Sequence, residues 1–164
     1  MTRQECAVLV GMIASAYPSW KPTQETVTVY VELLVDLEMN EAQNALRRLL
    51  MGSEYPPAVA TIRKKVLEER GELPLTKNDA WQLVMGQVRD KGIYERPYFS
   101  DQIVSQVVQA IGYRELCQST NTDTIRAQFF RLYEEQSQRH LEEKLSSVGF
   151  QTELESMRAK EIEA

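Results

Sequence analysis

The sequence predicts an all-α protein, and three observations support this fold class. Apolar residues recur three or four positions apart in one segment after another, which is the spacing of one helix face. Strict alternation of apolar and polar residues is confined to residues 27–31, which lie inside a longer helical period and have no turn-linked partner strand. Glycine and proline separate the segments, and both residues are typical of helix ends.

The first part of the chain predicts about four short helices. The first ends before Pro18, which cannot continue it, and the second starts after a threonine N-cap at Thr23. Asn40, with Gln43 three residues later, predicts a capping box for the third helix. The diproline at 56–57 predicts an extended entry to the fourth helix. The apolar faces of these helices are formed by Cys6, Leu9, Val10, Ile13, Val27, Tyr30, Val31, Leu34, Leu37, Ala42, Ala45, Leu46, Leu49, Leu50, Val59, Ile62 and Val66.

A second module of three to four helices is predicted after residues 71–76, where glycine and proline interrupt the pattern. Thr76 resembles the N-cap of a helix that Gly92 ends, and Ser100 is expected to cap a helix that Gly112 ends. A short helical turn and a long helix starting near Thr122 follow. We therefore expect an N-terminal domain at 1–72, a second module at 76–137 and a tail at 138–164.

The predicted tail is acidic and poor in apolar residues. From position 134 to the end there are eight acidic and four basic residues, a net charge of −4. Such a composition buries too little apolar surface to offset the entropy lost on ordering its backbone. We expect a flexible or extended helical segment that is partly disordered alone and folds on a partner groove.

Composition excludes several classes of function. A net charge of −5 is unlike that of a nucleic-acid coat protein, and no apolar run has the length of a membrane span. The two cysteines, Cys6 and Cys117, lie far apart and predict reduced, buried thiols in a soluble intracellular protein. No glycine spacing forms a phosphate-binding loop, and the single histidine, His140, has no neighbouring ligands or triad partners. We expect no catalytic residue, metal site or cofactor.

The pattern over residues 1–70 resembles the N-terminal domain of the small helicase loader/inhibitor proteins encoded by phages of Gram-positive bacteria. The matching features are Tyr17-Pro18, Trp20, Thr23, the helices at 30–37 and 40–50, and the turn Tyr55-Pro56-Pro57 before Ile62. Trp20 and Tyr30 would be core residues of this domain. The second half, around Ala80-Trp81 and Phe99-Ser100-Asp101, also looks like a region of phage replication proteins, so the chain departs from the shortest loaders by inserting a module before the tail.

The resemblance implies a non-enzymatic protein of the bacterial host cytoplasm that binds a hexameric replicative helicase and acts as loader, inhibitor or both. An origin-binding initiator protein would be a further partner. The tail would make the helicase contact, and its anchors would be Leu141, Leu145, Phe150, Leu154 and Met157.

A different class of function stays open, namely a DNA-binding replication-initiation or regulatory protein. Its candidate DNA contacts are the basic residues Arg47, Arg48, Arg63, Lys64 and Lys65, which helix packing could bring onto one surface. Charge on the outer face of an amphipathic helix is the common alternative. A structural adaptor whose tail binds an unrelated protein is a third reading.

Aromatic residues gather in the segment 93–99, where Tyr94, Tyr98 and Phe99 follow the helix that carries Trp81. Exposed aromatics can stack on bases of single-stranded nucleic acid. Aromatics beside proline and glycine more commonly fill the joint between two helices. We expect core packing, with a partner-facing surface as the alternative.

Overall fold

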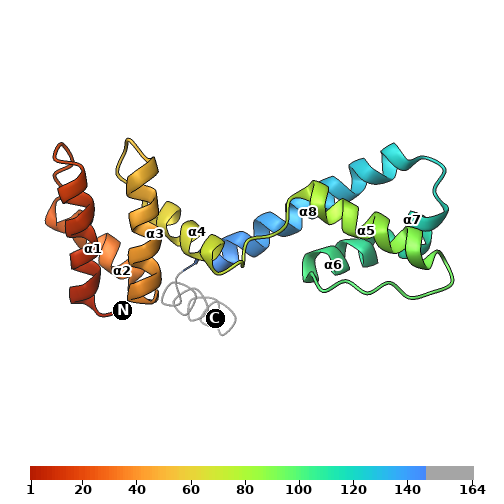
Figure 1. Cartoon of the computed structure of the whole chain (residues 1–164), viewed down its shortest axis with the longest axis horizontal. Coiled ribbons are helices and arrows are strands. Elements are labelled where there is room, and N and C mark those ends of the chain that lie inside the picture. Colours follow the sequence, from red (N-terminus) through yellow and green to blue (C-terminus); the bar gives the residue numbers. More distant parts are fainter. Residues whose placement is uncertain (147–164) are drawn as a thin grey trace, which may run out of the picture. The chain divides into compact units, whose positions relative to one another are not determined.

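The computed structural model describes residues 1–146, and Figure 1 shows that this part of the chain is entirely helical in its regular structure. The all-α prediction is confirmed, and residues 27–31, the strand-like stretch, lie inside a helix. The helices are α1 (Arg3–Ala16), α2 (Gln24–Leu34), α3 (Met39–Gly52), α4 (Val59–Glu69), α5 (Lys77–Lys91), α6 (Gln102–Ile111), α7 (Tyr113–Gln118) and α8 (Thr122–Leu145).

The chain divides into two compact units. Unit 1 is discontinuous: it comprises Met1–Leu73 and a second segment that starts at Lys144. Unit 2 comprises Pro74–Glu143. The division between the first two segments falls inside the interval 71–76 that the sequence marked. The return of the chain to unit 1 at Lys144 has no counterpart in the sequence-based prediction.

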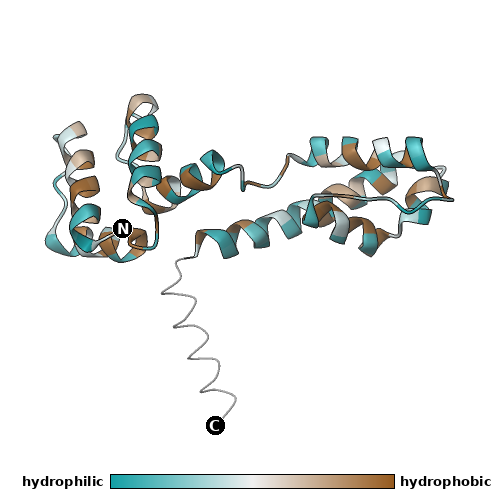
Figure 2. Cartoon of the chain, turned by 60° about the horizontal axis from the view of Figure 1, so that its bottom comes forward, coloured by the Kyte–Doolittle hydropathy of each residue, from teal (hydrophilic) through white to brown (hydrophobic). Residues whose placement is uncertain are grey.

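Unit 1 is built from α1 to α4, with α3 packed against α4 and α1 packed against both α2 and α3. Hydrophobic and hydrophilic residues alternate along its helices, as Figure 2 shows, and the buried apolar ones form one cluster. Trp20 and Tyr30 are half-buried against this core, with their ring centroids 5.8 Å apart, and the Tyr30 hydroxyl donates to the carbonyl oxygen of Pro57 at 3.1 Å. The buried residues are Cys6, Leu9, Ile13, Leu34, Leu37, Ala42, Ala45, Leu46, Ile62 and Val66.

Unit 2 has its own core, centred on aromatic side chains of α5 and α8. The Trp81 and Phe129 rings lie 5.3 Å apart, and Phe129 stacks on Tyr133 at 5.7 Å. The buried residues are Ala80, Trp81, Val84, Ile103, Val104, Val107, Val108, Ile111, Leu116, Ile125, Phe129 and Tyr133. Each unit therefore buries a separate hydrophobic cluster.

Several helix ends follow the predicted signals. Thr23 caps α2 by accepting from the backbone N–H of Thr26, and Thr76 caps α5 by accepting from that of Asp79. Gly92 and Gly112 end α5 and α6 with φ angles of 60° and 97°, which side chains of L residues rarely adopt.

Two predicted caps are wrong. The helix expected to start at Asn40 starts at Met39, with Glu38 at the N-cap and no side-chain capping hydrogen bond. Gln43 approaches the sulfur of Met12 instead, at 3.8 Å. Asp101 rather than Ser100 caps α6 and accepts from the Val104 N–H at 2.8 Å, because the helix starts one residue later than expected and aspartate is as good an N-cap as serine.

The last helix extends into the segment expected to be flexible or extended helical. The predicted second module ends at 137, and α8 continues to Leu145 through the first residues of the predicted tail. Pairs four residues apart support this stretch, with Arg139 Nη2 2.6 Å from Glu135 and Gln138 Nε2 2.8 Å from Glu142.

Candidate functional site

Arg63 of α4 lies at the centre of a buried polar site in unit 1. It is 6% exposed and is the one polar or charged residue among the buried residues of the described range. Nη1 donates to Asp36 Oδ1 at 2.7 Å and to the Leu33 carbonyl oxygen at 2.9 Å, and Nη2 donates to Asp36 Oδ2 at 2.8 Å. Nε donates to the carbonyl oxygen of Leu145 at 2.7 Å, and Nη2 donates to that of Ser146 at 3.2 Å. All five N–H donors of the guanidinium are therefore used.

This arrangement satisfies a charge that would otherwise be costly to bury. A buried cation is tolerated when it is paired and fully hydrogen-bonded, and the planar fork of arginine matches a carboxylate with two parallel bonds. Leu33 and Leu145 lie at the C-terminal ends of α2 and α8, where backbone carbonyls lack helical partners. Arg63 of α4 thus donates hydrogen bonds to backbone carbonyls at the C-terminal ends of α2 and α8.

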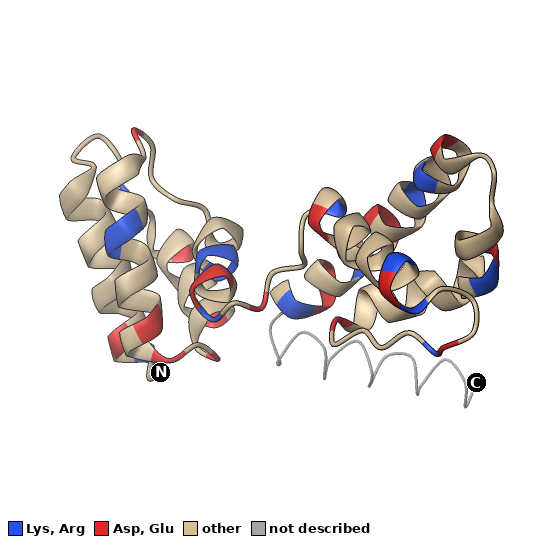
Figure 3. Ribbon diagram, turned by 45° about the vertical axis from the view of Figure 1, so that its right-hand side comes forward, with Lys and Arg blue, Asp and Glu red and all other residues tan. Residues whose placement is uncertain are grey.

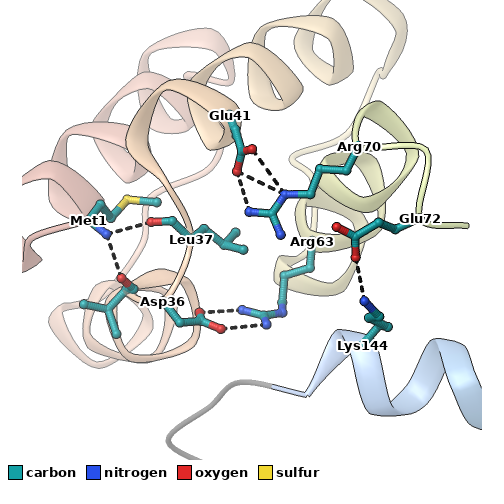
Figure 4. A network of polar contacts seen from close by, with 9 residues as sticks. Met1, Asp36, Leu37, Glu41, Arg63, Arg70, Glu72 and Lys144 are labelled. Carbon is teal, nitrogen blue, oxygen red and sulfur yellow. Dashed lines mark hydrogen bonds and ion pairs between the residues drawn. The ribbon is translucent and has the colours of Figure 1, made fainter.

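Two further ion pairs lie around this site (Figure 4). Lys144 Nζ is 2.7 Å from Glu72 Oε2, and Arg70 pairs with Glu41 through both carboxylate oxygens. Hydrogen bonding to Glu41 raises the pKa of Arg70 above its ordinary value. The Glu72–Lys144 pair joins the end of the first segment of unit 1 to the residue at which the chain returns.

The burial of Arg63 corrects one predicted DNA contact. A phosphate-contacting arginine needs an accessible guanidinium, but the donors of Arg63 are occupied by protein acceptors. The helical pattern held a signal for this placement. Arg63 lies four residues after Val59 and three before Val66, so it shares the apolar face of α4.

The remaining basic candidates are exposed or half-buried on α3 and α4. Arg48 Nε is 3.2 Å from Glu69 Oε1, and Lys65 Nζ is 2.9 Å from Glu68 Oε1. Lys and Arg are interspersed with Asp and Glu in Figure 3 rather than gathered on one element. Arg47 and Lys64 are exposed. The structure brings no concentrated cationic surface together from these side chains.

The predicted helicase anchors fall in two groups. Leu141 and Leu145 lie in the last turns of α8 and are half-buried, and the Leu145 carbonyl belongs to the Arg63 site. Phe150, Leu154 and Met157 lie outside the described residues. The latter three stay candidates on the strength of the sequence alone.

The aromatic segment after α5 is divided between core and surface. Trp81 is buried and Phe99 packs against the core of unit 2, as expected. Tyr94 and Tyr98 are 93% and 74% exposed, so the core prediction is wrong for these two side chains. The backbone at Tyr98 is held by Gln87, whose Oε1 accepts from the Tyr98 N–H at 3.3 Å.

The described residues provide no site for metal chemistry. No group of three or more His, Cys, Asp and Glu side chains within 1–146 could hold a metal ion. None of the helices in the same range combines the length and hydropathy that a membrane crossing requires. Cys6 is buried and Cys117 is half-buried, and both are free thiols.

Comparison with known proteins adds one match. Residues 1–63 fit the family model for the N-terminal domain of the helicase loader of phage SPP1. The matched residues cover α1 to α3 and the part of α4 that ends at Arg63. Neither the curated proteins nor the solved structures yielded a match.

Proposed function

We propose that the protein binds a hexameric replicative helicase during phage DNA replication, on the premise that residues 1–63 match the N-terminal domain of a phage helicase loader. The match to the loader domain is the observation that carries the proposal. As loader, inhibitor or both, the protein would hold the helicase until an origin complex containing an initiator protein receives it. It would act in the cytoplasm of the bacterial host.

We propose that the protein has no ATPase activity of its own. Its glycines stand at 11, 52, 71, 86, 92, 112 and 149, and no pair begins the GxxxxGK[ST] pattern that cradles nucleotide phosphates. Loading would then depend on binding energy and on the ATPase of the helicase.

We place the helicase contact in the C-terminal segment, at Phe150, Leu154 and Met157, with Leu141 and Leu145 of α8 as supporting residues. Leu154 and Met157 are three positions apart, a spacing that puts two side chains on one helix face in a partner groove. The acidic character of the segment suits a groove with basic or apolar walls.

The test is native mass spectrometry with a bacterial replicative helicase, with and without ATP. The wild-type chain should give a complex with the ring of defined subunit count. The triple variant F150A/L154A/M157A should lose it, whereas L83A, which removes a leucine that is 48% exposed in unit 2, should retain it. Binding by the triple variant at wild-type affinity would refute the proposed contact.

DNA binding through Arg47, Arg48, Lys64 and Lys65 is a second proposal, supported by the exposure of Arg47 and Lys64. Such a complex should weaken log-linearly with salt, and R47Q/K64Q should flatten the slope. The same variant should leave helicase binding unchanged. If the protein bound neither helicase nor DNA, the result would favour the third interpretation, a structural adaptor.

A further inference from the structure

We propose that Arg63 is a positioning residue for the C-terminal segment: it fixes Leu145 and Ser146 on the loader domain and so sets where residues 147–164 begin. The consequence for helicase loading rests on the proposed function. The anchoring itself follows from the geometry of unit 1.

The contacts that carry the proposal are made to backbone, not to side chains. Arg63 Nε and Nη2 reach the carbonyl oxygens of Leu145 and Ser146 at 2.7 and 3.2 Å. These are the last two residues that the structure describes, and they immediately precede the segment with the proposed helicase anchors. Because the acceptors are carbonyl groups, the site fixes the path of the chain whatever side chains stand at these positions.

The same guanidinium is itself held in place by the loader domain. Asp36 accepts from both Nη atoms, and the Leu33 carbonyl accepts a further bond at 2.9 Å, so the guanidinium cannot rotate without losing several hydrogen bonds. The Glu72–Lys144 pair, 2.7 Å long, adds a second tie at the residue preceding Leu145. Segments 82 positions apart in sequence are thereby joined at one point.

The point at which the segment starts matters because, under the proposed function, the segment holds unit 1 beside a bound ring. When one site binds a partner through a tethered segment, the effective concentration of the second site depends on the length and slack of the tether. Anchoring at Ser146 fixes the residue from which this segment continues. Loss of the anchor would release the last turn of α8 from unit 1 and weaken the alignment of unit 1 with a bound ring.

The first test is hydrogen exchange of the full-length protein without helicase. In R63K the charge stays, but lysine has three donors in place of five and lacks the planar fork. Amides of residues 142–146 should exchange at least about tenfold faster, while those of α1 and α3 stay at wild-type rates. The matched control R70K alters the exposed pair with Glu41 and should change residues 142–146 by less than about twofold. Unchanged exchange of 142–146 in R63K would overturn the proposal.

Because Arg63 is buried, R63K also tests the stability of unit 1 as a whole, so a second pair of variants tests the anchoring from the surface. E72K should accelerate exchange of 142–146 a few-fold, and E72K/K144E should restore it by reversing the pair. If R63K unfolds unit 1 and E72K leaves these amides at wild-type rates, the anchoring proposal is wrong.

Helicase experiments then separate this proposal from the proposed function. If the segment binds helicase and Arg63 positions it, R63K should bind the ring within about threefold of wild type yet load it at least about fivefold less efficiently. A loss of binding as large as that of F150A/L154A/M157A would overturn the positioning role. A wild-type chain without helicase affinity would refute the proposed function and leave the exchange result standing.

Discussion

The hydroxyl of Tyr133 donates to the carbonyl oxygen of Leu75, 3.1 Å away, and so ties α8 to the segment that leads into α5. The Tyr133 side chain is 1% exposed and stacks on Phe129. Burial raises the pKa of its phenol, so the hydroxyl remains a donor at neutral pH.

Replacing this hydroxyl should destabilise unit 2 while leaving its packing intact. Y133F removes the donor and leaves the Leu75 carbonyl without this partner, at an expected cost of about 1 kcal/mol in the free energy of unfolding. The two tryptophans, Trp20 and Trp81, lie in different units, so urea unfolding of Y133F in a W20F background follows unit 2 by Trp81 fluorescence. Y94F, at a side chain that is 93% exposed, is the control and should match the background.

Phe129 should be far less tolerant of truncation. It is fully buried among aromatic rings, and F129A should lower the free energy of unfolding of unit 2 by about 3–5 kcal/mol. Because unit 1 has a separate core, Trp20 fluorescence in a W81F background should report an unchanged transition for that unit. Equal loss of both transitions would show that the two units unfold as one.

The start of α1 predicts a dependence on acidity. Thr2 and Glu5 form a capping box, and hydrogen bonds from the Thr2 backbone and side chain lower the pKa of Glu5. A lowered folded pKa means that the stabilisation is present above the unfolded value of about 4.3 and is lost as the pH falls through the folded value. On acidification, the amides of α1 should therefore lose protection against hydrogen exchange relative to the amides of α3. E5Q should abolish that difference, and a wild-type response in E5Q would exclude Glu5 as its source.

The two thiols should differ in reactivity. Burial raises the pKa of the Cys6 thiol, and its side chain is fully buried, whereas Cys117 is half-buried. A disulfide reagent at pH 8 should modify Cys117 rapidly and Cys6 only as unit 1 opens. In C117S the rapid phase should vanish, and its persistence would contradict the burial of Cys6.

Local signals account for most of the helices but not for the way unit 1 is completed. Threonine and glycine at Thr23, Thr76, Gly92 and Gly112 act through neighbouring backbone, so the sequence alone was enough to place those helix ends. Arg63 was misread because a charged residue is normally exposed, even though its spacing placed it on the apolar face. Its partners lie far along the chain, and no local pattern predicts a contact of that separation. The last turns of α8 lie in the segment that the sequence predicts to be flexible or extended helical, and pairs such as Arg139–Glu135 support the helix there.

The discontinuity of unit 1 has a consequence for synthesis on the ribosome. α1 to α4 leave the exit tunnel first, and at that stage Arg63 can reach Leu33 and Asp36, while water must serve Nε and one proton of Nη2. Unit 2 must then be translated before Leu145 and Ser146 emerge, and closing that long loop carries an entropic cost that grows slowly with its length. Unit 1 is therefore the first part of the chain to begin folding and the last to be completed.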